Sequence, residues 1–340
     1  MKPIALVRAG AARPFTEVLE GAGAPVESLW ERAGLPVGAL ERPEAALPMR
    51  LLEQFVDHAA RTQGIDDLGI LAAQSGLAAL AEHGRAIRSA PTLAEAIRRA
   101  QAGQAGWSNG EQLLLVPEGD QVRFLRRRRW DRISSWHGDV FAVRVMLTLV
   151  ALAAGGDWRP REVGLQSPGH PELAAALERH LGPVRRGCPA SGFAFPRAFL
   201  ARRLDPERGH RPSEREVAPV PGRLPSDLIG ALREIGIPLL REGRFSVVAA
   251  AEASGTSVRT LQRHLRAGAS SFSLLVEQTR FLMATRLLED SDLRVIDVAM
   301  ELGYSDPAHF TRAFRRWAAV SPLEYRRSCM APSDARRTTA

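Results

Sequence analysis

The feature that most constrains this chain is a helical pattern that occurs twice, 48 residues apart. In the first copy, residues 246–255 are typical of a short helix that ends at Gly255, and glycine readily takes the left-handed conformation that a sharp turn needs. Gly303 occupies the equivalent place in the second copy, after matching apolar pairs. A further helical pattern follows each glycine, at residues 258–266 and 307–317. The repeat therefore predicts two helix-turn-helix units, a geometry that lets one helix enter the major groove of DNA.

The second helix of the first copy has two distinct faces. Its apolar residues recur at three- and four-residue spacing and predict a buried stripe, made of Val258, Leu261 and Leu265. Its polar residues share another face, made of Arg259, Gln262, Arg263 and Arg266. Arginine and glutamine can form bidentate hydrogen bonds to guanine and adenine. A single stripe of this kind fits a solvated helix face equally well, but its repetition favours DNA binding.

The second copy has the same organisation. Asp306 is placed to cap the helix, and Pro307 suits the first helical position, where its missing N–H costs nothing. The predicted buried residues are Phe310, Phe314 and Trp317, and the predicted outward residues are His309, Arg312 and Arg316. Residues 272–288 form an amphipathic stretch that could hold the two units apart. Recognition helices about 34 Å apart would enter successive segments of the major groove.

The charge and composition of the chain limit its partners and its compartment. The net charge of +8 favours a polyanion, although basic proteins also bind membrane surfaces. The most apolar stretch, residues 140–154, is interrupted by Arg144, and the first residues lack a signal-peptide core. Cys188 and Cys329 match no metal or redox spacing. We therefore expect a cytoplasmic protein without a disulfide.

The chain is long enough for two domains. We expect an effector-binding or dimerisation domain at residues 1–205, a linker rich in proline at 206–225, a helical domain at 226–330 and a disordered tail at 331–340. Periodicity predicts helices in the first domain at residues 26–33, 48–62, 67–74, 93–102, 133–154 and 171–181. It predicts strands at residues 113–116 and 122–128, around a turn at 117–120, and weaker ones at 161–166 and 192–195. The expected fold class is an α+β amino-terminal sensing domain followed by an all-α domain with two helix-turn-helix units.

The helical domain resembles the DNA-binding domain of the AraC/XylS family of transcription regulators. Residues 257–263, 295–317 and 320–326 carry this resemblance, which extends over about residues 246–327. It implies that the residues approaching bases are Arg259, Thr260, Gln262, Arg263, His309 and Arg312. It implies that the residues meeting phosphates are Arg266, Arg315 and Arg316.

The first domain resembles the arabinose-binding-type sensing domain of one branch of that family, over about residues 5–205. Four stretches carry the resemblance: residues 7–10, 32–36, 89–93 and 157–163. Residues 182–192, with Cys188, depart from the usual pattern. The resemblance implies a small organic effector, a homodimer, RNA polymerase as a partner, and activation of transcription more than repression. It does not establish arabinose as the ligand.

Several conspicuous residues allow more than one interpretation. Trp107, Trp136 and His137 are candidates for effector contact, as are Trp130 and Trp158, although large aromatic residues more often belong to the core. The run of four arginines at residues 126–129 could be taken for a nucleic-acid patch. On a strand, alternate side chains point to opposite faces, which favours a solvated or internally paired edge strand over a contact with a ligand carboxylate or a partner.

These observations predict a sequence-specific DNA-binding regulator, not an enzyme, without cofactor or metal. Two rival interpretations remain open. An enzyme acting on damaged DNA would need a reactive cysteine or a metal site, and an architectural DNA protein would lack a pocket of ligand size. The effector, the operator and the sign of regulation are not fixed by the sequence.

Overall fold

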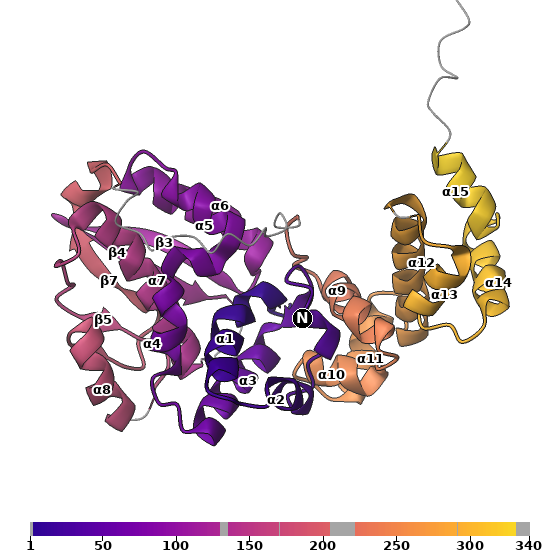
Figure 1. Ribbon diagram of the computed structural model, residues 1–340, viewed down its shortest axis with the longest axis horizontal. Helices are drawn as coiled ribbons and strands as arrows, with labels where there is room; N and C mark the ends of the chain where they lie inside the picture. Colours follow the sequence, from indigo (N-terminus) through magenta and orange to yellow (C-terminus); the bar gives the residue numbers. More distant parts are fainter. Residues whose placement is uncertain (1–2, 130–134, 170, 205–221, 291, 331–340) are drawn as a thin grey trace, which may run out of the picture. The chain divides into compact units, whose positions relative to one another are not determined.

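The computed structural model describes residues 3–129, 135–169, 171–204, 222–290 and 292–330 (Figure 1). The chain divides into two compact units, Met1–Ala231 and Leu232–Ala340. Most of the predicted linker and the whole predicted tail lie outside the described residues, so the proposed domain boundaries stay predictions. Unit 1 is α+β and unit 2 is helical, which confirms the expected fold class.

The helices and strands of unit 1 begin with a short strand near the amino terminus. The strands are β1 (Leu6–Arg8), β2 (Ala46–Pro48), β3 (Glu111–Glu118), β4 (Gln121–Arg128), β5 (Val163–Gly164), β6 (Val184–Arg185) and β7 (Ser191–Pro196). The α-helices are α1 (Arg13–Gly21), α2 (Val26–Arg32), α3 (Met49–Gln63), α4 (Leu68–Ala72), α5 (Ala81–Arg88), α6 (Leu93–Trp107), α7 (Trp136–Ala154) and α8 (Pro171–Leu181). The 3-10 segments are η1 (Ala9–Ala12), η2 (Val37–Ala39), η3 (Ala73–Leu80) and η4 (Arg197–Ala201).

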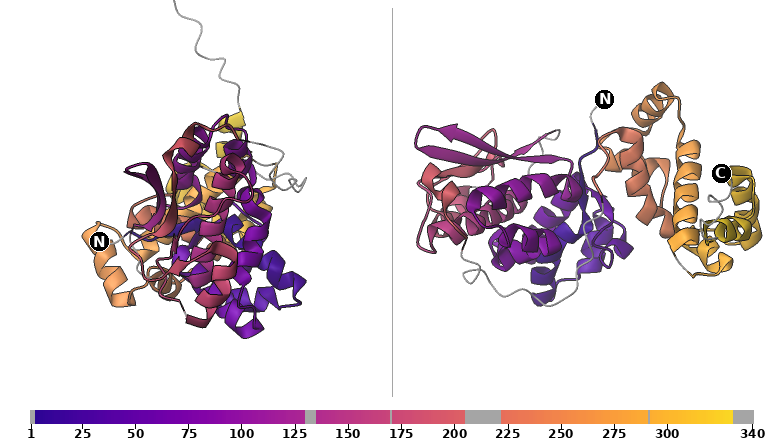
Figure 2. Two further views of the ribbon diagram at one scale, coloured as in Figure 1. Left: turned by 90° about the vertical axis from the view of Figure 1, so that its left-hand side faces the viewer. Right: turned by 90° about the horizontal axis from the view of Figure 1, so that it is seen from above.

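A five-stranded sheet with the order β3-β4-β7-β5-β6 organises the larger core of unit 1. The β3–β4 hairpin turns at Gly119, whose φ of 63° is a left-handed conformation that glycine adopts without strain. Helices pack on one face of the sheet, with α6 against β3 and α7 against β4 and β7 (Figure 2). A second core forms around β1, β2 and α1 to α3, and Phe141 of α7 packs against both cores.

The arginine-rich strand β4 corrects one expectation. Its alternate side chains do point to opposite faces, since Arg126 and Arg128 are buried and Arg127 is exposed. However, β4 pairs with β3 on one side and β7 on the other, so it is an inner strand and not an edge strand. The partner β7 lies far along the chain, and the period of a single strand does not reveal it. The two buried arginines are internally paired, as predicted.

Helix α7 is the only helix among the described residues that is long and apolar enough to cross a membrane. A core helix of the same length passes this test, and α7 has the packing of a core helix, with Val143 and Val150 fully buried. Ser135 caps its start by accepting a hydrogen bond from the Gly138 N–H at 2.9 Å. The predicted helix began earlier, at residues that lie outside the described part of the chain.

Unit 2 consists of α-helices joined by short turns. They are α9 (Leu228–Arg241), α10 (Val247–Ala253), α11 (Val258–Ala267), α12 (Phe272–Asp290), α13 (Val295–Glu301), α14 (Pro307–Ala318) and α15 (Pro322–Met330). Helix α9 starts in unit 1 and continues into unit 2. Helix α12 lies between the two predicted helix-turn-helix units (Figure 2). Leu275 and Met283 of this amphipathic helix are buried, whereas the Leu282 surface is 40% exposed.

Candidate DNA-binding surface and effector cavity

The first helix-turn-helix unit is α10, a tight turn and α11. Gly255 makes the turn in the left-handed conformation, with φ of 62°. Ser257 then caps α11, because its Oγ accepts a hydrogen bond from the Thr260 N–H at 3.2 Å. Leu261 and Leu265 are fully buried beneath the helix. The burial of these two residues fixes which face of α11 points to solvent.

The outward face of α11 carries the residues predicted to read bases. Four of the predicted residues are exposed: Arg259, Gln262, Arg263 and Arg266. Thr260 is half-buried, and its Oγ1 accepts a hydrogen bond from the Ser257 Oγ at 3.0 Å. Within the described residues, no carboxylate forms an ion pair with Arg259, Arg263 or Arg266. This face therefore presents guanidinium groups that are free to bind an external acceptor.

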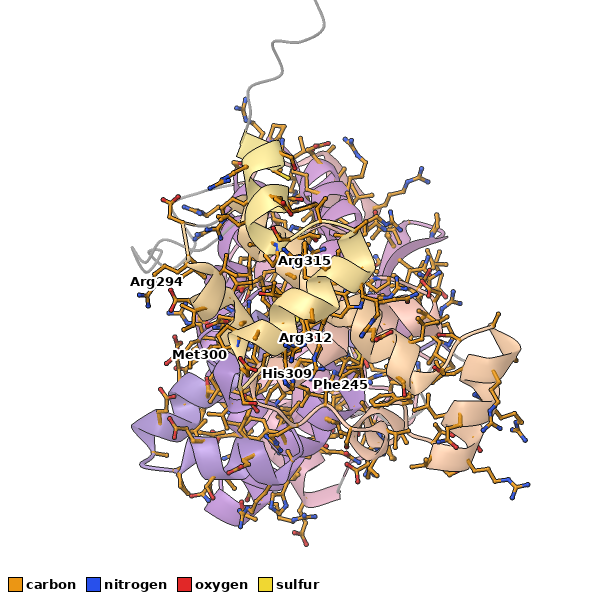
Figure 3. The ribbon with its side chains drawn as sticks, turned by 90° about the vertical axis from the view of Figure 1, so that its right-hand side faces the viewer. Phe245, Arg294, Met300, His309, Arg312 and Arg315 are labelled. Atoms are coloured by element: carbon orange, nitrogen blue, oxygen red, sulfur yellow. The ribbon has the colours of Figure 1, made fainter. Side chains whose placement is uncertain are left out.

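The second unit, α13 and α14, repeats this geometry. Gly303 makes the turn with φ of 74°, and Asp306 caps α14 by accepting from the Ala308 N–H at 2.8 Å. Phe310 and Phe314 are fully buried, whereas Trp317 is only half-buried. Figure 3 shows three exposed residues in succession along α14: His309, Arg312 and Arg315.

Two residues of α14 have intramolecular partners. The Arg316 guanidinium is paired with the Glu277 carboxylate of α12, although both side chains are exposed. The His309 Nε2 lies 3.5 Å from Asp306 Oδ2, a contact that becomes an ion pair only when the imidazole is protonated. Arg312 has no ion-pair partner in the described part of the chain. Of the arginines on α14, Arg312 is thus better placed than Arg316 to bind a base.

Unit 1 contains a cavity of about 180 Å³ between its two cores. Its wall is mostly apolar and comes from β1, β3, β4, α1, α3, α5, α6 and α7. The polar and charged side chains in the wall are Glu53, His83, Gln104, Ser108, Glu111, Arg126 and Ser135. A mostly apolar cavity with a few convergent polar groups is typical of a small-molecule site.

A cluster of buried charges lies at one side of this cavity. Arg126 bonds Asp139 through Nη1 and Oδ1 at 2.7 Å and is paired with Glu111 through its other terminal nitrogen. Arg128 binds both carboxylate oxygens of Glu53, one of them at 2.7 Å. Burial raises the pKa of Glu53 to about 7, even though the two guanidinium groups favour its ionised form. The carboxyl of Glu53 can therefore gain or lose a proton near neutral pH.

The predicted effector contacts fall in different places. Trp107 lines the cavity, and its indole N–H is buried with no hydrogen-bond partner in the described part of the chain. Trp136 and His137 do not line the cavity, although both are buried at the start of α7. Trp158 packs its ring against Phe193 and Phe199 in the core. Trp130 lies outside the described residues.

The sequence interpretation missed the charged part of the cavity wall. Glu53 and Glu111 were not candidates, because a single glutamate in a helix or strand has the pattern of a solvent-facing residue. Their burial depends on Arg126 and Arg128, which come from a different strand. No local signal identifies such a site, since it forms only when distant segments pack together.

A short segment of unit 1, residues 222–225, is anchored beside the cavity wall. The Arg8 guanidinium donates three hydrogen bonds to backbone carbonyls, at 2.9 Å to Gly222, 3.0 Å to Gly106 and 2.8 Å to Glu44. The Leu224 N–H donates to the Ala105 carbonyl at 3.0 Å. Residues 105 and 106 belong to the end of α6 that also carries Trp107. We call residues 222–225 the anchored segment, and the chain continues from it into α9.

The cysteines bear on the enzyme interpretation. Both are free thiols, and Cys188 is half-buried whereas Cys329 is exposed. Within the described residues, no group of three or more histidine, cysteine, aspartate or glutamate side chains could hold a metal ion.

Comparisons with known proteins identify both units. The model of the arabinose-binding domain of AraC transcription regulators matches residues 23–204, more than half of the chain, and a helix-turn-helix model matches residues 250–328. VirS of Mycobacterium tuberculosis is 36% identical over 105 residues, 30% of this chain and 31% of VirS. The ornithine utilization regulator of Pseudomonas aeruginosa is 34% identical over 89 residues, 26% of each protein. The matched segments thus span less than a third of these relatives.

Two solved structures are also similar. The transcriptional regulator CdpR from Pseudomonas aeruginosa is 19% identical, with 93% of this chain and 97% of CdpR covered and a TM-score of 0.38. The DNA-binding domain of AdpA, solved with a target DNA, is 33% identical over 30% of this chain and 93% of its own, with a TM-score of 0.26. The two family models establish the identity: this chain belongs to the AraC family of transcription regulators, with an arabinose-binding-type amino-terminal domain and a helix-turn-helix DNA-binding domain.

Proposed function

We propose that the chain is a cytoplasmic, sequence-specific regulator that reads DNA with α11 and α14 under the control of a small organic effector. The observation that carries the proposal is the repeated arrangement of these helices. Each buries leucine or phenylalanine on one face, and each exposes an arginine on the other that has no ion-pair partner among the described residues, as Arg263 and Arg312 do.

The individual roles follow from exposure and from existing partners. The proposed base contacts are Arg259, Gln262 and Arg263 on α11 and His309 and Arg312 on α14. Thr260 is half-buried and already holds a hydrogen bond to Ser257, so its proposed base contact is a secondary one. The proposed phosphate contacts are Arg266, Arg315 and Arg316. Arg316 would have to leave Glu277 or share it, so Arg266 and Arg315 should contribute more.

The proposed effector site is the cavity of unit 1, with Trp107 in its wall. The presence of a cavity of ligand size favours a sensing role over that of an architectural DNA protein. We further propose that the chain acts as a homodimer joined through unit 1 and that it activates transcription by contacting RNA polymerase. These last proposals rest on the family and not on a contact within this chain.

A run-off transcription assay tests the sign of regulation. The assay uses purified RNA polymerase and a template that contains a DNA site bound by the chain. The wild-type chain should increase the amount of transcript, whereas the Arg312→Ala variant should not. A fall in transcript with the wild-type chain would instead identify a repressor.

The anchored segment offers a route from the cavity to the DNA-binding unit. Trp107 and Ser108 line the cavity, and the adjacent Ala105 and Gly106 carbonyls hold the segment that leads into α9. An effector that shifts the end of α6 would change the strength of these hydrogen bonds. The required coupling free energy between two such sites is typically about 1–3 kcal/mol, or about 5- to 150-fold in affinity.

Replacing Arg8 with methionine tests this route. The substitution removes three hydrogen bonds that join the anchored segment to α6 and to residue 44. The test uses any small molecule that raises the melting temperature of the wild-type chain. In the Arg8→Met variant, we expect this molecule to change DNA affinity by less than about twofold, well under the usual range of coupling. The matched control is Arg13→Met, because the Arg13 guanidinium has only the exposed Glu17 of its own helix as an ion-pair partner among the described residues. An undiminished response of Arg8→Met to the small molecule would rule the route out.

A further inference from the structure

We propose that the cavity of unit 1 binds a small monoamine with an apolar body, whose ammonium group lies against Glu111 and Glu53. The inference rests on the proposed effector site and names the chemical class of its ligand. Three properties of the cavity support it: its size, the polarity of its wall and the balance of charge beside it.

The size and polarity of the cavity restrict the body of the ligand. An engineered cavity of about 150 Å³ in another protein is known to hold benzene, so about 180 Å³ suits one ring or a short branched chain. Most of the wall consists of apolar side chains, such as Val56, Ile87, Phe141 and Met146. A sugar would bring several hydroxyl groups, and each one left without a partner in an apolar site has a free-energy cost. The wall therefore fits an apolar body better than a sugar.

The five charged groups of this cluster do not balance one another. Three carboxylates, on Glu53, Glu111 and Asp139, face two guanidinium groups, on Arg126 and Arg128. When all five are ionised, one negative charge is left over. Among the described residues that line the cavity, the only basic side chain besides Arg126 is His83. Asp57, which accepts from Ser135 at 2.6 Å, is acidic, and burial lowers the pKa of His83 and so favours its neutral form.

One carboxylate oxygen is open to a ligand. Glu111 Oε1 is paired with Arg126, but within the described residues its Oε2 has only the Gln104 amide at 3.5 Å, which is long for a hydrogen bond. An ammonium group in the cavity could donate to this oxygen and balance the cluster. A carboxylate ligand would add a second uncompensated negative charge to a buried site, which is strongly unfavourable.

The titration of Glu53 gives the binding a characteristic pH dependence. Glu53 on α3 faces Arg126 and Arg128 of β4, Glu111 of β3 and the cavity itself, and burial raises its pKa to about 7. In the empty cavity, a proton on Glu53 balances the cluster. An ammonium group takes the place of that proton, so binding releases it. The affinity for an amine should therefore rise as the pH rises through 7 and then level off.

Calorimetric titration of the full wild-type chain tests the ligand class directly. The probes are phenethylamine, phenethyl alcohol, phenylacetate and arabinose. We expect the amine to bind at least about tenfold more tightly than the alcohol, because a hydrogen bond to a charged group contributes about 1.5–3 kcal/mol. We expect phenylacetate and arabinose to bind most weakly. Tightest binding of either of these two, or no binding of the amine, would overturn the proposal.

Two substitutions locate the ammonium group. Glu111→Gln should weaken the binding of phenethylamine by about tenfold or more and leave the affinity for phenethyl alcohol unchanged. The control Glu118→Gln removes an exposed charge of the same strand and should change neither affinity. The wild-type chain should bind phenethylamine about tenfold more weakly near pH 6 than near pH 8, and Glu53→Gln should abolish this difference. Circular dichroism shows whether each variant is folded. If a variant does not fold, the calorimetric titrations of the wild-type chain with the four probes still decide the ligand class. An unchanged amine affinity in folded Glu111→Gln would contradict the placement.

The same titrations separate this inference from the proposed control of DNA binding. If the amine fails to bind while another small molecule alters DNA affinity, the ligand class is wrong and the effector role stands. If the amine binds and leaves DNA affinity unchanged, the site is correct and the effector role fails.

Discussion

Replacing Phe310 with alanine is expected to destabilise unit 2 by about 3–5 kcal/mol, the usual cost of removing a buried phenylalanine ring. Phe310 is fully buried and lies within 5.6 Å of the Tyr304 ring and 5.8 Å of the Phe314 ring, centroid to centroid. The same core includes Leu240 and Val298. Because α14 is held on the domain by this core, the variant should also lose DNA binding.

Urea unfolding followed by far-ultraviolet circular dichroism measures the loss of stability, and the transition of unit 2 is the one that should shift. Leu323→Ala is the matched control, because 47% of the Leu323 surface is exposed and its truncation should change the free energy of unfolding by about 0.5 kcal/mol or less. A cost for Phe310→Ala below about 1 kcal/mol would show that α14 is not anchored as described.

The combined substitution of Arg263 and Arg312 by alanine should have the largest effect on DNA binding. Each arginine is expected to contribute about 1–3 kcal/mol through a bidentate contact with a base. They belong to separate helix-turn-helix units, and effects at distant sites usually add, so the double variant should lose about 2–6 kcal/mol of binding free energy.

Fluorescence anisotropy with a bound DNA site measures this loss. The matched control is Arg127→Ala, which removes an equal charge from an exposed position of unit 1. If the control weakens binding as much as a single variant of unit 2 does, bulk charge and not base readout explains the affinity.

The helices of unit 2 could be predicted because their signals are local. Gly255 and Gly303 mark both turns, and Ser257 and Asp306 mark the helix starts that they cap. Apolar spacing then fixed the buried face, with Leu261 and Phe310 beneath their helices. Each of these signals lies within a few residues of the feature that it determines. The exposure of Arg263 and Arg312 follows from the same spacing.

Unit 1 was less predictable, because its core depends on contacts between distant segments. The hairpin of β3 and β4 was correctly predicted from its turn, but the position of β4 inside the sheet was not, since β7 follows much later. The short helices α1 and α5 and the strands β1, β2 and β6 were not predicted at all. The strands β1, β2 and β6 have only two or three residues each, too few for a periodic pattern to be detected.

The cavity shows the same limit in chemical terms. Glu53 binds Arg128, which lies 75 positions further along the chain, and only this contact reveals that a helical glutamate is buried. Trp107 was a candidate as an aromatic residue, and the structure places it in the cavity wall. Trp136 and His137 were candidates as well, but they lie outside the lining. Residue type alone therefore could not distinguish a cavity wall from a core.

Selection of binding sites from random DNA tests the central claim most directly. The full wild-type chain should select one sequence with two informative segments about 10–10.5 base pairs apart, one for each recognition helix. Arg263→Ala should relax the preference at one base position in the first segment, and Arg312→Ala at one position in the second. If both variants select the same sequence as the wild-type chain, or if the wild-type chain selects no sequence at all, α11 and α14 do not read DNA as proposed.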